Sequence, residues 1–71
     1  MKIVLNGEPY DLDARRTVSE LLVHLEIDAR RVAVEHNMVV IKRAAFDATE
    51  IHEGDQLEIV NFVGGGDAPE P

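Results

Sequence analysis

The stretch Gln56-Leu57-Glu58-Ile59-Val60-Asn61-Phe62-Val63, followed by Gly64-Gly65-Gly66, decides the fold of this chain. The segment from Leu57 to Val63 is rich in β-branched and aromatic residues, and the turn signal Glu53-Gly54-Asp55 precedes it. Because a strand this apolar is best placed where both of its edges are paired, we predict that it is the central strand of a small sheet. The glycines lack a Cβ and pack against nothing, so we expect the chain to leave the domain there as a mobile backbone.

The composition describes one small domain with an aliphatic core. The chain has 71 residues, of which 45% are hydrophobic, with one Tyr, two Phe and no Trp. The absence of cysteine excludes a disulfide framework, a cysteine-based metal site and a side-chain thiol. The formal net charge of −7 disfavours nucleic acid as a partner and suits contact with a basic patch on another protein.

The start of the chain has the pattern of a β-hairpin. A strand is predicted from Lys2 to Asn6, and Asn6-Gly7 is the strongest short hairpin signal. Tyr10 and Leu12 belong to the returning strand, and Pro9 fits its first residue or an edge position. Because no long apolar segment precedes this hairpin and none approaches membrane-spanning length, we expect no signal peptide, no membrane partner and a cytoplasmic protein.

A helix follows the hairpin. Thr17-Val18-Ser19-Glu20 has the capping-box pattern, in which Thr17 caps the helix and Glu20 reaches back to it. The helix should run from about Val18 to about Glu26. Its apolar stripe, spaced i, i+3, i+4 and i+7, predicts the face that covers the sheet and consists of Val18, Leu21, Leu22 and Leu25.

Two more strands are predicted before the last one. They are Val32–Glu35 and Val39–Ile41, and His36-Asn37 forms the turn between them. The segment that follows has no clear pattern, but Phe46 and Ile51 are expected to seal one end of the core.

The order of these elements predicts the fold class. A hairpin, a helix and later strands imply a crossover that places the last strand parallel to the first. The fold is therefore expected to be α+β, in the β-grasp (ubiquitin-like) arrangement. In it, a mixed sheet of four to five strands holds one main helix on one face.

The position of the three glycines in the chain says more about function than the presence of a glycine-rich segment does. A glycine-rich end alone is an ordinary flexible linker. Here the glycines continue the predicted central strand, which suits a carrier that threads its C-terminus into another protein's active site, because side chains would block a narrow channel. Residues 67–71 are small, acidic or proline, so we expect a domain over 1–66 and a disordered extension over 67–71.

Val60, Phe62 and Val63 are candidates for partner docking. If the other apolar residues of the last strand face the helix, Val60 and Phe62 lie on the open face of the sheet beside the tail. Burial under a loop explains the same pattern equally well. The alternation also points Asn61 inward, unless a bulge changes the register.

The titratable residues indicate no catalytic site, no metal site and no cofactor. His24, His36 and His52 are scattered without metal-ligand spacing, which is typical of surface histidines. The short basic pairs are expected to be solvated charge, and a partner contact stays open for Lys42 and Arg43. No nucleophile–base–acid set and no phosphate loop is evident.

The chain resembles the ThiS family, the sulfur carrier proteins of thiamine biosynthesis. The likeness covers Met1 to Gly66, and the ordered set of motifs is more specific than any one of them. The matching stretches are residues 3–8 (Ile3-Val4-Leu5-Asn6-Gly7-Glu8), 17–22, 32–37 and 54–66.

The resemblance implies a carrier that catalyses nothing itself. In this family an ATP-dependent, ubiquitin-activating-like adenylyltransferase activates the C-terminal glycine carboxylate. A cysteine desulfurase system then supplies sulfur for a thiocarboxylate, which donates it to thiazole synthase. On this chain the resemblance places the carboxylate at Gly66 and the threaded approach at Gly64 and Gly65. A chain without cysteine fits this chemistry, because the terminal carboxylate is the available place for activated sulfur.

The sequence departs from the family pattern after the glycines. Mature family members end in glycine, whereas here a peptide bond joins Gly66 to Asp67, and an amide cannot be adenylated as a carboxylate can. Either a processing protease removes residues 67–71, or the chain is not competent as encoded. Two alternatives stay open: the small subunit of molybdopterin synthase or another pathway's sulfur carrier, and, from a different class, a ubiquitin-like modifier or interaction module.

Overall fold

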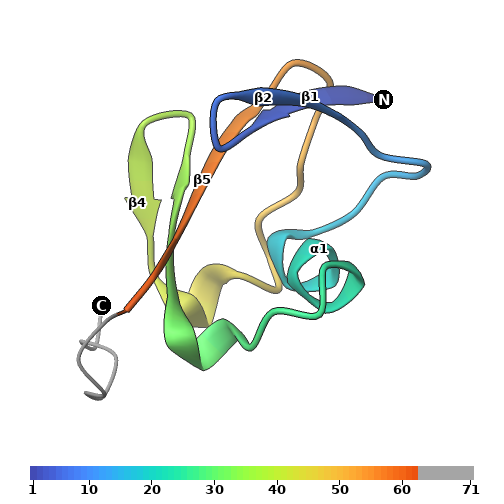
Figure 1. The fold of residues 1–71 in the computed structure, drawn as a ribbon. Helices are drawn as coiled ribbons and strands as arrows, with labels where there is room; N and C mark the ends of the chain where they lie inside the picture. The colour runs from blue at the N-terminus through green and yellow to red at the C-terminus, as the bar shows by residue number, and fades with distance from the viewer. Residues whose placement is uncertain (63–71) are drawn as a thin grey trace.

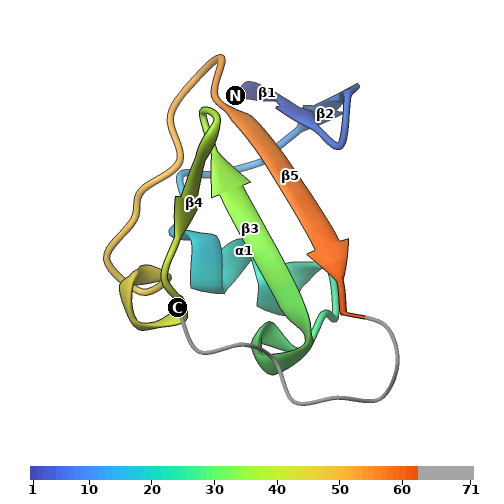
Figure 2. The ribbon, with the colours of Figure 1, turned by 90° about the vertical axis from the view of Figure 1, so that its left-hand side faces the viewer.

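The computed structural model describes residues 1–62 as one sheet that holds one α-helix on one face (Figure 1, Figure 2). The sheet has five strands in the order β2-β1-β5-β3-β4. Within this part of the chain, no helix has the length and apolar character needed to cross a membrane. The elements are β1 (Lys2–Leu5), β2 (Glu8–Asp11), α1 (Val18–His24), the 3-10 helix η1 (Ala29–Arg31), β3 (Val32–His36), β4 (Val39–Ile41), the 3-10 helix η2 (Arg43–Ala45) and β5 (Gln56–Asn61).

Strand β5 lies in the middle of the sheet, as predicted. It pairs in parallel with β1, where Val4 lies opposite Gln56 and Leu5 opposite Leu57. Along its other edge it pairs antiparallel with β3 from Leu57 to Asn61. Within residues 1–62, the mixed sheet of five strands and its single α-helix confirm the predicted β-grasp arrangement.

Both hairpins turn through residues in the left-handed region. Asn6 and Gly7 have φ angles of 51° and 82°, and Asn37 and Met38 have φ angles of 52° and 73°. Two consecutive left-handed residues make the tight turn whose twist matches that of the flanking strands. The predicted His36-Asn37 turn is therefore wrong by one residue, because His36 is the last residue of β3 and the turn is Asn37-Met38.

The start of α1 has a hydrogen-bond acceptor for each of its first amides. The amide of Thr17 donates to Glu20 Oε1 at 2.8 Å, and the amide of Glu20 donates to Thr17 Oγ1 at 3.2 Å. The amides of Val18 and Ser19 donate to carbonyl oxygens in the segment 46–49. Amides at the start of a helix have no acceptor inside the helix itself. Here the predicted capping box supplies acceptors for two of these four amides, and the segment 46–49 supplies acceptors for the other two.

The helix ends earlier than predicted. It stops at His24 rather than Glu26, and Glu26 adopts a left-handed φ of 60°. The amides of Glu26 and Ile27 donate to the carbonyls of Val23 and Leu22, which is the Schellman pattern. Glycine usually occupies the left-handed position of this motif, so the sequence lacked the signal that marks such an end.

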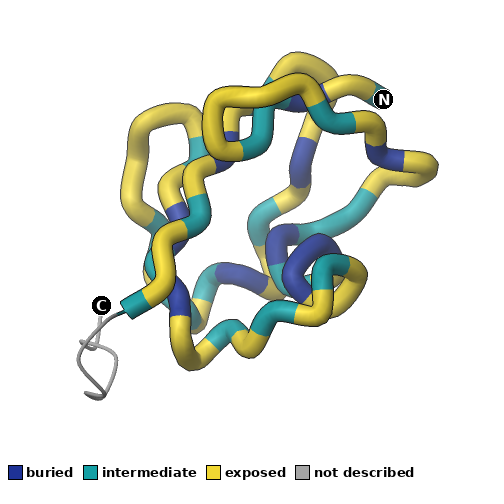
Figure 3. Tube along the Cα trace, in the orientation of Figure 1, coloured by how far each residue is buried: buried dark blue, intermediate teal, exposed yellow. Residues whose placement is uncertain are grey.

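The core lies between α1 and the sheet, where the buried segments of Figure 3 face one another. Three residues of the helix stripe are buried, and Leu25 is half-buried at its end. Phe46 and Ile51 are buried, as predicted for the segment that seals the core. The buried apolar residues are Ile3, Leu12, Val18, Leu21, Leu22, Val32, Val34, Phe46, Ile51 and Leu57.

Replacement of Leu22 by alanine tests the helix–sheet packing. Leu22 is 1% exposed, so Leu22→Ala should lower the free energy of unfolding by roughly 2–5 kcal/mol. Urea denaturation followed by circular dichroism measures this change. The matched control is the next residue, since Val23 is 76% exposed and Val23→Ala should change stability by less than about 0.5 kcal/mol. Equal losses in both variants would contradict the assigned helix face.

Candidate functional site

The face of the sheet opposite α1 presents apolar and acidic side chains side by side. Paired residues of neighbouring strands point to the same face, so Val60 shares its face with Ala33. By the same register, Glu58 lies opposite Glu35, which in turn lies opposite Val40. Val60 is 59% exposed and Val40 is 63% exposed. The predicted position of Val60 on the open face is therefore confirmed, while partner docking through it stays a prediction.

Phe62 lies one residue beyond β5 and is half-buried. Its amide donates to the carbonyl of Arg31 at 2.9 Å, so the pairing of β5 with the start of β3 continues to this residue. The register runs without a bulge from Leu57 to Asn61. Asn61 is exposed at the end of the strand, so its position on the helix face buries no amide.

The remaining predicted site residues follow Phe62. Val63, Gly64, Gly65 and Gly66 lie outside the described residues, as does the extension 67–71. Their roles in docking, threading and sulfur attachment stay predictions. Among the described residues, the element that precedes this motif is β5, which is paired with β3 (Figure 2).

A polar cluster around Asp55 holds the start of β5. Asp55 Oδ2 lies 2.7 Å from His36 Nε2 and accepts the backbone amide of His52 at 2.8 Å. Asp55 Oδ1 accepts a hydrogen bond from Asn37 Nδ2 at 3.2 Å, and the carboxylate side chain is only 12% exposed. Burial raises the pKa of Asp55, but hydrogen bonds from His36, the His52 amide and Asn37 outweigh it and hold that pKa below its ordinary value.

This cluster corrects the interpretation of one histidine. His24 and His52 are exposed, as predicted, but His36 is half-buried and bonded to Asp55. The Asn37 turn and the Asp55 turn meet because β3 and β5 run antiparallel, so the end of one strand lies beside the start of the other. Polar residues at both turns were the available sequence signal, since Asn and Asp side chains often bond to nearby backbone and polar groups.

Asn6 has a second role that its turn position did not reveal. Strand β1 ends at Leu5, yet Asn6 Oδ1 accepts the amide of Ile59 at 2.7 Å. The amide of Asn6 donates to the carbonyl of Leu57 at 2.8 Å. This residue therefore makes the hairpin turn and also extends the β1–β5 pairing by one side-chain contact.

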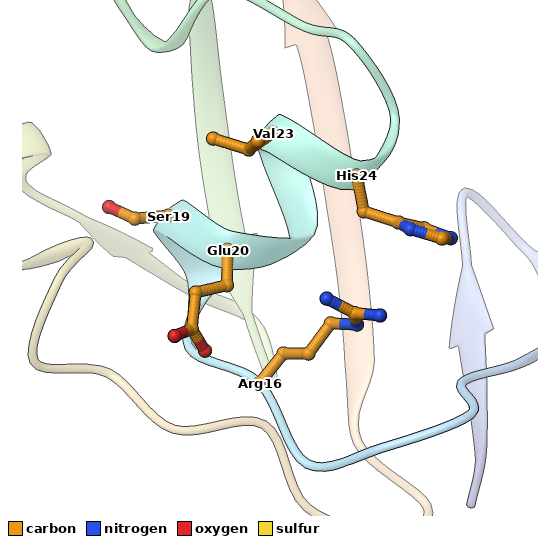
Figure 4. Close-up of a pocket in the computed structure, with 5 residues that line it drawn as sticks. All are labelled: Arg16, Ser19, Glu20, Val23 and His24. Carbon is orange, nitrogen blue, oxygen red and sulfur yellow. The ribbon is translucent and has the colours of Figure 1, made fainter.

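An open depression of about 430 Å³ lies on the outer side of α1 (Figure 4). Its lining residues are Arg16, Ser19, Glu20, Val23 and His24. Arg16 bonds to Asp13 at 2.8 Å in the loop before α1, and Glu20 belongs to the capping box, so both charged side chains already have partners inside the domain. Within residues 1–62 no group of three or more histidine, aspartate or glutamate side chains is placed to hold a metal ion. This depression is not part of the site at β5.

Comparison with known proteins gives a consistent result. A family model described as the ThiS family matches residues 3–66. The crystal structure of a thiamine biosynthesis protein (ThiS) from Geobacter metallireducens is similar, with a TM-score of 0.82 and 42% sequence identity. That match covers 93% of this chain and 100% of the other chain.

Two curated relatives add to this result. The sulfur carrier protein ThiS of Bacillus subtilis is 36% identical over 50 residues, which cover 70% of this chain and 76% of the relative. The thiazole synthase of Paramagnetospirillum magneticum is 44% identical over 66 residues, or 93% of this chain. The chain spans only 20% of the length of that thiazole synthase.

Replacement of Asp55 by asparagine tests the cluster at the start of β5. At neutral pH, Asp55→Asn should lower the free energy of unfolding by roughly 1–3 kcal/mol, because hydrogen bonds to a charged acceptor are lost. The folded pKa lies below the ordinary value of 3.8, so the charged form stabilises the fold above that pH and this contribution is lost as the pH falls through the folded pKa.

The pH dependence separates this effect from a general loss of packing. The difference between the wild type and Asp55→Asn should shrink below pH 3.8, because the wild-type carboxyl then becomes protonated as well. Urea denaturation at several pH values measures it, with Asp47→Asn at an exposed position as the control. A difference that is the same at every pH would contradict the role of the charge.

Proposed function

The chain belongs to the ThiS family, and on that premise we propose that it is a sulfur carrier protein of thiamine biosynthesis. The observation that supports this most directly is the continuity of β5 with the glycine motif. Strand β5 is paired on both edges, and the family match extends from residue 3 to residue 66, the last glycine. The carrier domain would be residues 1–66.

The proposed chemistry takes place at the carboxylate of Gly66. Gly64 and Gly65 precede it and would pass through the narrow channel that leads to the active site of a partner enzyme. Attack of this carboxylate on the α-phosphate of ATP forms an acyl-adenylate and releases pyrophosphate. A persulfide formed from cysteine by the desulfurase system then displaces AMP to give an acyl disulfide. A thiol cleaves the S–S bond of this acyl disulfide, which leaves the thiocarboxylate on Gly66 and a disulfide as the second product. In this scheme the chain is a substrate of an ATP-dependent adenylyltransferase and acts as a carrier rather than as an enzyme.

The proposed acceptor of the sulfur is thiazole synthase. The thiazole synthase of Paramagnetospirillum magneticum contains a segment similar to this chain, which supports a functional link between the two kinds of domain. Such a link favours thiazole formation over the small subunit of molybdopterin synthase. The adenylyltransferase and a cysteine desulfurase system complete the proposed set of partners.

A ubiquitin-like modifier is the alternative from a different class, and mass spectrometry separates the two functions. A sulfur carrier gains about sixteen mass units at its C-terminus, because one oxygen is replaced by sulfur. A modifier is instead found in isopeptide linkage to lysines of other proteins. Recovery of such conjugates without any thiocarboxylate would contradict the proposed function.

Replacement of Val60 tests whether the open face docks a partner. Val60→Ala removes apolar contact area at an exposed position, so it should weaken binding to thiazole synthase by roughly 1 kcal/mol, or about fivefold, and leave stability nearly unchanged. Isothermal titration calorimetry measures the affinity. Val23→Ala is the matched control, because this valine is also exposed but lies on the outer side of α1. Equal affinities of the two variants would contradict docking through Val60.

The extension after Gly66 leads to the last test of the proposed function. We propose that a protease cuts between Gly66 and Asp67, since the peptide bond there leaves no carboxylate to activate. The full-length chain should then give no ATP–pyrophosphate exchange with its adenylyltransferase, whereas a chain that ends at Gly66 should. Mass spectrometry of protein recovered from its native cells checks for the same end. Exchange by the intact chain, with Pro71 still present in cells, would contradict the processing step.

A further inference from the structure

Cationic side chains gather at one end of the sheet, although the formal net charge of the chain is −7. The 3-10 helix η1 comes directly before β3, and η2 follows β4 after one residue. Because β3 and β4 are antiparallel partners, the start of β3 lies beside the end of β4, so η1 and η2 lie at the same end of the sheet. The cations that these segments bring together, here called the basic end, are Arg30, Arg31, Lys42 and Arg43.

Strand β5 also ends at the basic end. Asn61, its last residue, pairs with Val32, the first residue of β3. The amide of Phe62 then donates to the carbonyl of Arg31 at 2.9 Å. Figure 2 shows the end of β5, η1 and η2 along the lower side of the sheet. Phe62, from which the chain continues into residues 63–71, therefore lies beside these cations.

The basic end already binds one carboxylate. Arg30 donates to Asp28 from Nε at 3.1 Å and from a terminal nitrogen at 3.0 Å, and hydrogen bonds from the Arg30 side chain and amide lower the pKa of Asp28 to about 2. Arg31 Nε lies 3.8 Å from the same carboxylate, beyond hydrogen-bond distance, and the Arg31 side chain is 82% exposed. Lys42 is exposed and makes no ion pair with any residue of the range 1–62. Arg31 and Lys42 therefore have donors for a further carboxylate.

The chain itself carries two carboxylates within reach of these donors. Asp67 and Glu70 follow Phe62 after a few residues, and residues 63–71 contain no cation. An extended chain covers about 3.3–3.6 Å per residue, so Asp67 can lie up to roughly 17 Å from Phe62. Strand β4, which Lys42 follows, lies two strand spacings or roughly 10 Å from β5. Both acids can therefore reach either cation.

We propose that Asp67 and Glu70 dock on Arg31 and Lys42, so that the extension 67–71 folds back over the end of the sheet at which β5 ends. The occupant of the basic end in the full-length chain is then its own acidic extension. Pro69, which lies between the two acids, restricts the backbone and so lowers the conformational entropy lost on docking. Exposed ion pairs of this kind are individually weak and are screened by salt, so the docking is reversible.

Docking of the extension also has a consequence for the carrier. Cleavage between Gly66 and Asp67 would free the Gly66 carboxylate and would also uncover Arg31 and Lys42 beside the departing tail. The unprocessed and processed chains would then differ in surface charge as well as in their C-termini. This consequence rests on the proposed function, whereas the docking itself is a property of the full-length chain alone.

A single spin label tests the docking in the full-length chain. The chain has no cysteine, so Ala68→Cys gives one attachment site for a nitroxide, which broadens the NMR signals of nearby amides. The amide signals of η1 and Lys42 should be broadened at about 50 mM NaCl, and the broadening should fall by at least about half at about 300 mM NaCl, where screening is stronger. The same spectra show whether each variant is folded.

Neutral variants separate docking from mere proximity of the label. D67N/E70Q and R31Q/K42Q should each reduce the broadening at η1 and Lys42 by at least about half, because each pair of substitutions removes one side of both ion pairs. All four substitutions together should reduce it no further, since the interaction is already lost in either pair. K2Q is the matched control, because Lys2 is exposed and its carbonyl accepts the amide of Gly54 before the start of β5, at the opposite end of that strand.

The outcomes distinguish this inference from the proposed function. Broadening that is equal in the wild type, in both pairs of neutral variants and at high salt would contradict the docking. Broadening that depends on the two acids but not on Arg31 and Lys42 would contradict this site. Thiocarboxylate formation is measured separately, on a chain that ends at Gly66. If it forms and the extension does not dock, the inference alone is wrong; if the extension docks and no thiocarboxylate forms, the proposed function alone is wrong.

Discussion

The pairing of β5 on both of its edges is the interaction on which the rest of this structure depends. Because β5 is parallel to β1, the chain must cross from the β1–β2 end of the sheet to the β3–β4 end before it returns to the centre. The segment that contains α1 makes this crossing over one face of the sheet. Its antiparallel contact with β3 then places the second hairpin at the far edge. Because each neighbour satisfies backbone groups of β5, displacement of this strand would leave amides and carbonyls of both neighbours without partners.

The two ends of β5 are held by different means, and this difference matters for the proposed carrier. At the start, the Asp55 carboxylate collects donors from the end of β3 and from its own turn. At the other end, a backbone bond from Phe62 to Arg31 continues the ladder to Phe62, the last described residue. The proposed carrier presents its C-terminus to successive enzymes. A strand that is already ordered in the free protein lowers the conformational entropy lost when the carrier binds them.

Patterns of near neighbours predicted much of this fold. The Asn6-Gly7 hairpin, the capping box at Thr17 and the apolar stripe of α1 each depend on residues within about one or two turns of one another, so the sequence shows them directly. The helix end was misplaced because Glu26 takes the left-handed position where glycine is the usual signal. The second turn was misplaced by one residue because Met38, like Asn37, adopts a left-handed φ that its side chain does not predict.

The sequence by itself determined the fold class, the central position of the last strand and the location of the glycine motif directly after it. Only the tertiary structure decided which distant side chains meet. The bond from His36 to Asp55, the acceptance of the Ile59 amide by Asn6 and the opposition of Glu35 to Glu58 all follow from strand register. Register is set by the fit of a whole sheet against its core, and a shift by one residue would exchange every side chain between the two faces.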